Sequence, residues 1–190
     1  MTKIDGEALH RDLPAIASQI RELVGEEGSL PPVETWQPER VGEIDIRIDS
    51  QGGWLYQGDK MERQAVVRLL SRVLRRDGDD FFLVTPYEKM KITVEDAPFV
   101  VVMMDREGRG DRQEIHFSTQ QGDYFTLSQE HPLEVVCNER GESIPYVRVR
   151  HKLMAKLSRP VYYELADYIC EHSGQTSDLG VWSAGQFFKF

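Results

Sequence analysis

Residues 43–49 read Glu43-Ile44-Asp45-Ile46-Arg47-Ile48-Asp49, a strict alternation of isoleucine with charged residues. A period of two is typical of a β-strand that buries one face and exposes the other. Gln51-Gly52-Gly53 follows as a turn, and Trp54-Leu55-Tyr56 is expected to return as the hairpin partner. This stretch therefore predicts that the core begins with an antiparallel hairpin.

The segment before this hairpin predicts a helix and an extended connector. Asp12 is a suitable N-cap, Pro14 is tolerated in a first turn, and Gly25 stands where a helix end is expected. Residues 26–38 contain three prolines, so they cannot continue the helix.

Two further helices are expected. Asp59 and Glu62 form a D-x-x-E capping pattern, which predicts a helix that runs to about Arg76. The last helix is expected to begin near Ser158, with Pro160 in its first turn. After it, residues 179–190 carry several large apolar side chains, so we expect this tail to be docked on the body of the protein.

Short strands separated by turn signals fill the middle of the sequence. We expect them at residues 81–85, 90–94, 99–104, 114–117, 124–127, 133–136 and 147–149, with residues 105–112 forming one of the turns. Strands so closely spaced predict a strongly bent sheet or partial barrel, closed by the last helix. The fold class is therefore α+β.

Composition excludes several classes of function. The chain has 190 residues, a net charge of −9 and 40% hydrophobic residues, which is ordinary for a globular protein. A protein this acidic repels nucleic-acid backbones and anionic membrane surfaces. We therefore expect it to bind neither bulk nucleic acid nor membranes. No apolar run reaches membrane-spanning length, and the amino terminus carries no secretory signal. Cys137 and Cys170, expected as small buried residues, suit a reducing compartment, which predicts a cytoplasmic protein.

Two pairs of segments resemble each other within the chain. Residues 61–69 resemble 157–165, each with an arginine two places after a leading apolar residue and just before a helical stripe. Residues 80–82 resemble 123–125, each opening a strand. Two independent echoes favour duplication over chance, and we expect two related strand-and-helix halves.

No sequence motif for catalysis or for metal binding is present. Gly108-x-Gly110 lacks the third glycine and the helix of a dinucleotide loop, and none of the five histidines has the spacing of a zinc ligand. We therefore expect no cofactor and no metal. A hydrolytic enzyme remains an alternative, with candidate groups at turn or strand-end positions: Glu88, Glu95, Asp96 and His131.

Arginines supply the candidate binding groups. Arg63 and Arg159 each fall in the first turn of a predicted helix, where a positive charge opposes the helix dipole unless an anion such as phosphate is bound. Arg148 and Arg150 alternate along one strand. The alternative is that each arginine pairs with one of the 32 acidic side chains.

Other side chains extend this set. Tyr146 and Tyr163 could provide stacking or hydroxyl contacts. A basic stripe is also expected on the second helix. If the protein is a protein-interaction adaptor, it could bind its partner through this stripe or through the aromatic tail. The alternative is that the stripe is only a solvated face of the helix. Its members are Arg68, Arg72, Arg75 and Arg76.

The combined pattern resembles a proteobacterial family of domains of unknown function. The matching motifs are Gly42-x-Ile44-Asp45-Ile46-x-Ile48, Gly53-Trp54-x-Tyr56, Leu83-Val84-Thr85-Pro86-x-Glu88, Val94-Glu95-Asp96-Ala97-Pro98-Phe99, Glu130-His131-Pro132-Leu133, Pro145-Tyr146-Val147-x-Val149-Arg150 and Trp182-Ser183-x-Gly185.

The resemblance implies a duplicated core, a C-terminal half like a pleckstrin-homology fold, and a signalling role. It also implies a nucleotide-like ligand bound between the halves. Our own hypothesis is that Trp54 or Tyr146 stacks on a flat ring of this ligand while the arginines hold its anion. We divide the chain into 1–30, 31–98 and 99–190. The expected ligand-binding residues are Arg63, Arg159, Arg150, Arg148, Tyr146, Trp54 and Thr85.

Overall fold

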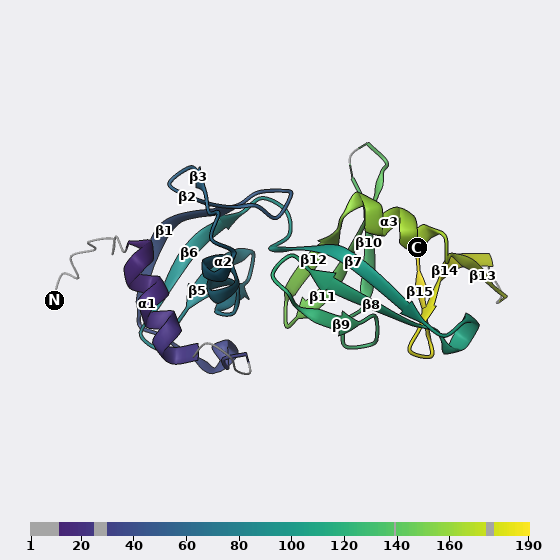
Figure 1. Cartoon of the computed structure of the whole chain (residues 1–190), viewed down its shortest axis with the longest axis horizontal. Helices are drawn as coiled ribbons and strands as arrows, with labels where there is room; N and C mark the ends of the chain where they lie inside the picture. Colours follow the sequence, from purple (N-terminus) through teal and green to yellow (C-terminus); the bar gives the residue numbers. More distant parts are fainter. Residues whose placement is uncertain (1–11, 25–29, 139, 174–176) are drawn as a thin grey trace. The chain divides into compact units, whose positions relative to one another are not determined.

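A computed structural model describes residues 12–24, 30–138, 140–173 and 177–190 (Figure 1). The chain divides into two compact units, Met1–Asp96 and Ala97–Phe190, and each is described by itself. Strands dominate both units and a few helices accompany them. The predicted α+β class and the organisation in two halves are therefore confirmed.

Unit 1 is built on a six-stranded sheet. Its strands are β1 (Arg40–Ile48), β2 (Trp54–Tyr56), β3 (Asp59–Lys60), β4 (Leu74–Asp77), β5 (Asp80–Val84) and β6 (Glu88–Val94), in the order β3-β2-β1-β6-β5-β4. The predicted first hairpin is confirmed, because β1 pairs antiparallel with β2 and places Ile48 opposite Trp54. At the centre of the sheet, β1 and β6 are parallel.

The alternation in β1 fixes which face of this sheet is buried. Ile44, Ile46 and Ile48 are buried, and α1 (Leu13–Val24) and α2 (Gln64–Ser71) lie over one face of the sheet in Figure 1. Burial of each such side chain stabilises the fold by about 2 kcal/mol. The predicted N-cap of α1 is confirmed, since Asp12 Oδ1 accepts a hydrogen bond from Ala15 N at 3.1 Å. Gly25, its predicted end, lies outside the described residues.

The predicted helix over residues 59–76 is wrong at both ends. Asp59–Lys60 is the short strand β3, and α2 ends at Ser71. The chain then enters β4, which pairs antiparallel with β5 from Leu74 opposite Leu83 to Asp77 opposite Asp80. Gly78, with φ of 63°, makes the tight turn between these strands. Residues 74–77 form a strand instead of continuing the helix, because the strand buries Leu74 against the sheet.

Unit 2 contains a second six-stranded sheet. Its strands are β7 (Phe99–Glu107), β8 (Glu114–Thr119), β9 (Tyr124–Thr126), β10 (Leu133–Cys137), β11 (Ser143–Arg150) and β12 (Leu153–Leu157), in the order β10-β11-β12-β7-β8-β9. The sheet curls into a half-barrel, as the sequence predicts, and α3 (Arg159–Ala166) packs beside β7 (Figure 1).

Three details of unit 2 differ from expectation. Strand β7 continues to Glu107, so the predicted turn at 105–112 narrows to the loop that holds the short 3-10 helix η2 (Gly110–Arg112). Strand β12 was not expected, yet it forms the parallel centre of the sheet with β7, where Ala155 lies opposite Phe99. Cys137, expected to be buried, is exposed on the edge strand β10.

Both sheets follow one topology. Counting six strands within each unit, the order across each sheet is third, second, first, sixth, fifth, fourth, with the first and sixth strands parallel. Duplication is therefore confirmed at the level of strand order. The sequence echoes align the wrong elements, because α2 follows the third strand of its sheet whereas α3 follows the sixth. Arg63 and Arg159 are not equivalent positions of the repeat.

The carboxy-terminal tail forms a small third sheet docked on unit 2. It consists of β13 (Cys170–Ser173), β14 (Ser177–Ser183) and β15 (Gln186–Lys189). Ile115 N donates to Ser183 Oγ at 3.0 Å, and Gln113 Nε2 donates to the Trp182 carbonyl at 2.6 Å. Phe188 is buried. The predicted docking of the tail is confirmed.

Candidate functional site

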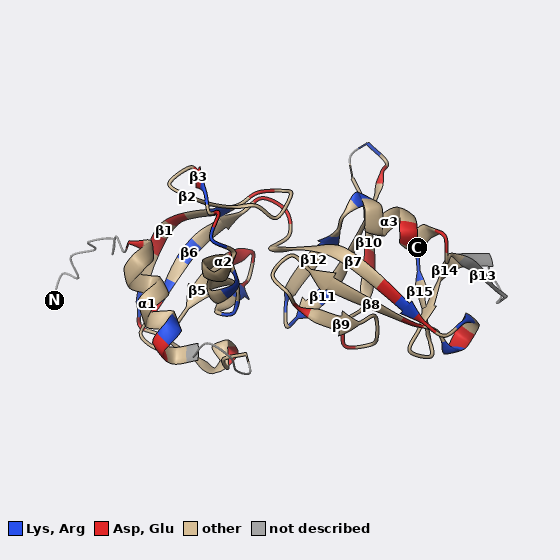
Figure 2. Cartoon of the chain, viewed as in Figure 1, with Lys and Arg blue, Asp and Glu red and all other residues tan. Residues whose placement is uncertain are grey.

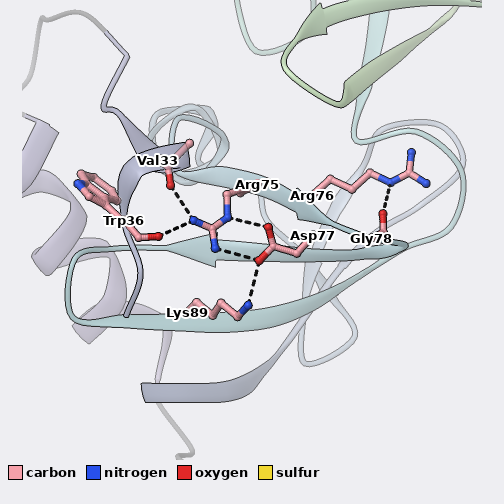
Figure 3. Close-up of polar contacts among 7 residues, drawn as sticks. All are labelled: Val33, Trp36, Arg75, Arg76, Asp77, Gly78 and Lys89. Atoms are coloured by element: carbon pink, nitrogen blue, oxygen red, sulfur yellow. Dashed lines mark hydrogen bonds and ion pairs between the residues drawn. The ribbon is translucent and has the colours of Figure 1, made fainter. Parts of the chain in front are cut away.

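Arg75 lies at the centre of a polar cluster in unit 1 (Figure 3). Its side chain is 5% exposed, and its Nε and Nη2 donate to the two carboxylate oxygens of Asp77, each at 2.9 Å. Its Nη1 donates to the carbonyls of Val33 at 2.8 Å and Trp36 at 2.7 Å. Lys89 Nζ adds a bond to Asp77 at 2.9 Å.

This cluster joins the connector before β1 to the edge strand β4. The short 3-10 helix η1 (Val33–Thr35) has carbonyls that a planar guanidinium can reach together with a bidentate carboxylate. The Arg75 hydrogen bond, with Lys89 beside it, holds the pKa of Asp77 below its usual range. With both charges paired, the cluster serves to fix the connector in place.

The basic stripe expected on one helix is not formed. Arg68 lies on α2 and Arg72 is its C-cap, whereas Arg75 and Arg76 lie on β4. Arg75 is buried, and Arg76 donates to the Gly78 carbonyl at 3.0 Å. The four arginines therefore do not form one docking surface, because two of them lie on strand β4 and not on the helix. In Figure 2, lysines and arginines are interspersed with acidic residues in both units.

Two of the expected ligand-binding residues are buried in unit 1. Trp54 is 2% exposed on β2, so its ring faces are covered by the core. Its Nε1 has no acceptor among the described residues. Thr85, also 2% exposed, accepts a hydrogen bond from Glu88 N at 3.1 Å and donates to the Glu88 carbonyl at 3.2 Å. Thr85 therefore shapes the turn between β5 and β6.

The two arginines of β11 pair with acidic side chains. Arg150 forms a largely buried ion pair with Asp123, and its guanidinium lies 4.8 Å from the centre of the Phe99 ring. Arg148 lies 3.6 Å from Glu134. Both arginines therefore follow the alternative considered for them, in which each pairs with an acidic side chain of the protein. Tyr146 is half-buried on the same strand, opposite Glu134 and Lys156.

Arg63 and Arg159 differ from the other arginines of the predicted set. Arg63 is exposed at the N-cap of α2 and makes no side-chain capping bond. Arg159 is exposed at the first position of α3, whose N-cap, Ser158, also makes no side-chain capping bond. Within the described ranges, neither guanidinium has an ion-pair or hydrogen-bond partner. Arg159 lies in the first turn of its helix, as predicted, whereas Arg63 lies one position before its helix, as the N-cap.

The amino end of α3 also presents an aromatic ring, which the predicted set of ligand-binding residues left out. Tyr163 is 62% exposed and stands four residues after Arg159, so the two side chains share one helix face. The rings of Tyr162 and Tyr163 lie 5.6 Å apart, and Tyr162 in turn stacks on Phe190. The i, i+4 spacing of Arg159 and Tyr163 was the signal in the sequence.

The carboxylates of the enzyme alternative have structural contacts. Glu95 binds the Arg47 side chain and accepts a hydrogen bond from Ser50 N at 3.0 Å. Glu88 is 3% exposed in unit 1, whereas His131, in unit 2, lies 3.0 Å through Nδ1 from the Arg148 carbonyl. Among the described residues, no group of three or more His, Cys, Asp or Glu could hold a metal ion.

These features define a two-unit α+β protein with a repeated six-strand sheet. The chain belongs to the DUF1285 family: the model of its N-terminal domain matches residues 31–97, and that of its C-terminal domain matches residues 98–190. Both are described as of unknown function. No curated protein matches the chain. No helix in the described part of the chain could cross a membrane.

Two solved structures are similar. The crystal structure of a DUF1285 family protein from Silicibacter pomeroyi DSS-3 is 39% identical, with a TM-score of 0.85, and the match covers 94% of this chain and 93% of that one. A DUF1285 family protein from Shewanella baltica OS155 is 25% identical, with a TM-score of 0.53, over 65% of this chain and 91% of that one.

Proposed function

We propose that this protein is a binding module for a small phosphate-bearing ligand of the nucleotide class, held at the amino end of α3 by Arg159 and Tyr163. The observation that carries the proposal is an exposed arginine without a partner in the described structure, one turn from an exposed tyrosine on the same face of a helix. The proposal concerns binding rather than catalysis.

The electrostatics of α3 favour an anion at this point. The first-turn N–H groups of a helix have no partner within it, and they make its amino end positive. Arg159 adds a second positive charge there, which costs the isolated protein a few tenths of a kcal/mol. A phosphate turns both contributions into attraction, because backbone N–H groups and guanidinium donors bind its oxygens.

Tyr163 gives the ligand its second recognition element. A ring 62% exposed can stack on a flat base while Arg159 holds the phosphate. The amino end of α2, where Arg63 is the N-cap residue, also combines first-turn N–H groups with a guanidinium, but α2 itself carries no aromatic residue. We assign it a weaker affinity for phosphate alone.

Arg148, Arg150, Trp54 and Thr85 are left outside this site because their contacts serve the fold. The strand order of unit 2, six strands followed by α3, supports a likeness in outline to a pleckstrin-homology fold. A signalling role and a cytoplasmic location complete the proposal, the latter supported by an exposed cysteine without a disulfide at Cys137.

The test is isothermal titration of the full chain with ATP, ADP, AMP, adenosine and inorganic phosphate. We expect binding of at least one nucleotide, a loss of about tenfold or more in Arg159→Gln, and a smaller loss in Tyr163→Ser. Adenosine should bind more weakly than AMP, because it lacks the phosphate.

Arg112→Gln serves as the matched control, since Arg112 is an exposed arginine of η2 in the same unit. It should bind like the wild type. Absence of binding by the wild type for all five probes, or equal losses in Arg159→Gln and Arg112→Gln, would contradict the proposal. Loss only in Arg63→Gln would move the site to α2.

A further inference from the structure

Strand β7 carries an irregularity that exposes two adjacent apolar side chains. Val101 lies opposite Thr119 and Met103 opposite Ser118, so Val102 is an extra residue on β7, a β-bulge. Val102 is 44% exposed and Met103 is 57% exposed. Bulges of this kind re-aim side chains and recur beside functional sites.

Cross-strand register places Tyr124 beside them. Met103 pairs with Ser118 and Ser118 pairs with Tyr124, so these residues project from the same face of β7, β8 and β9. Tyr124 is 62% exposed. The opposite face of these strands is buried in the core, where Met104 on β7 lies opposite Phe117 on β8.

The Tyr124 ring is held in place although it is exposed. It stacks on His116, with ring centroids 5.5 Å apart and planes 20° apart. His116 is itself 8% exposed, and its Nδ1 lies 2.9 Å from Thr126 Oγ1. A pre-oriented aromatic side chain loses little conformational entropy when it is covered, which is the property of binding hot spots.

Carboxylates continue the same face beyond this patch. Asp105 pairs with His116, and Glu107 pairs with Glu114, so all three acids project on the side of Met103 and Tyr124. The arginine between Asp105 and Glu107 does not neutralise them, because Arg106 lies 4.3 Å over the ring of Tyr168. Figure 2 shows the acidic and basic positions alternating where β7 runs toward η2.

The other half of this face carries cations. Lys156 on β12 and Arg148 on β11 share the side of Tyr146, and Arg148 is close to Glu134. Glu134 also projects there, beside Arg148. Asp105, Glu107 and Glu114 form a separate acidic group at the carboxy-terminal end of β7 and the amino-terminal end of β8. A partner that buries Met103 and Tyr124 must place positive charge over Asp105, Glu107 and Glu114.

We propose that Val102, Met103 and Tyr124 form a docking surface for a cationic amphipathic segment of another protein. Its apolar side chains cover the β7 bulge and the Tyr124 ring, and its lysines or arginines lie over the three carboxylates. The exposed apolar groups supply affinity, and the acidic end of the face sets the orientation.

The experiment measures fluorescence anisotropy of a labelled peptide in which leucines recur every three to four positions and lysines fill the others. A twin peptide has glutamate for every lysine. We expect the lysine peptide to bind the full-length protein, more weakly as salt rises, and the glutamate twin not to bind. The double variant Met103→Ser/Tyr124→Ser should bind at least tenfold more weakly.

Matched variants separate this face from the charge of the whole chain. Asp105→Asn/Glu107→Gln/Glu114→Gln should lose affinity. Asp111→Asn/Glu130→Gln/Glu164→Gln, with the same net charge and exposed positions in unit 2, should keep it. Val41→Ser/Tyr87→Ser, which removes a valine and a tyrosine that are each 58% exposed in unit 1, should also keep it.

Several outcomes would overturn the proposal. One is no binding of the lysine peptide by the wild type, and another is equal affinity of face and control variants. A third is a wild-type dimer on size exclusion that Tyr124→Ser dissociates, because the face would then be occupied by a second copy of this chain. Circular dichroism and thermal melting confirm that each variant is folded before it is compared.

Discussion

Arg75 and Asp77 point toward each other from positions two apart on strand β4 and form a bidentate ion pair. Side chains two apart on a strand share a face, so the edge strand itself provides the spacing that a planar guanidinium requires. The remaining donor of the pair reaches back to the connector that precedes β1.

Removal of this guanidinium should destabilise unit 1. Arg75→Ala leaves Asp77 Oδ1 and two carbonyls without their donor, while Lys89 still donates to Asp77 Oδ2. We expect a loss of about 3 kcal/mol in the free energy of unfolding. Arg75→Lys should recover only part of this, because an ammonium cannot bind both oxygens in parallel. Arg76→Ala removes an ion pair with the fully exposed Asp79 and a hydrogen bond to the Gly78 carbonyl, and should cost about 1 kcal/mol. Urea denaturation of the three variants checks this order.

Acid should weaken the same cluster. Because the folded state lowers the pKa of Asp77, the carboxylate stabilises the fold above its unfolded value of about 3.9, and this contribution is lost as pH falls through the folded value. The stability difference between wild type and Asp77→Asn should therefore be constant from pH 7 to about pH 5 and shrink below about pH 4. Denaturation curves at several pH values test this, and a difference that grows on acidification would contradict it.

Gly180 should tolerate no side chain. A Cβ at this position would overlap the carbonyl oxygen of Phe188, which belongs to the paired strand β15. Gly180→Ala should therefore separate β14 from β15 and cost about 3 kcal/mol. Gly185→Ala, at the turn of the same hairpin, meets no atom and is strained only by its φ of 73°, so it should cost about 1 kcal/mol. Thermal unfolding of the two variants gives the order.

Ser183 should prove important for docking of the tail. Its hydroxyl, fully buried, accepts the hydrogen bond of Ile115 N, and Ser183→Ala leaves that N–H without a partner. We expect a loss of about 1–3 kcal/mol. Ser118→Ala, at a half-exposed position of β8, is the control and should be close to neutral. Equal stability of the two variants would show that the tail contributes little to unit 2.

Local patterns predicted much of the fold. The alternation over residues 43–49 and the proline at position 160 were sufficient for β1 and for the start of α3. The helix at 59–76 failed because Leu74 fits the helical spacing while Asp77-Gly78 signals a hairpin, and the gain from pairing with β5 decided between them. Strand β12 lacks a strong pattern of its own and exists because β7 and β11 flank it.

In the candidate site, too, local features could be predicted from the sequence and long-range contacts could not. Exposure of Arg63 and Arg159 at helix starts was predictable, since caps and first turns are local features. The pairing of Arg150 with Asp123 was not, because it joins the end of β11 to the turn between β8 and β9. Long-range ion pairs depend on the topology of the sheet. The resemblances within the sequence did not predict that topology, because they align elements that are not equivalent in the two units. The bulge at Val102 likewise becomes visible only through its register with β8.

The parallel pairing of first and sixth strands in each unit has a consequence for the order of folding. Every other pairing in the two six-stranded sheets joins neighbours along the chain, whereas Arg40 meets Glu88 and Val101 meets Leu157 only after two meanders have formed between them. Closing such long loops costs more entropy than closing a hairpin. Each sheet should therefore assemble from its edges inward, and its middle should be the last part to form.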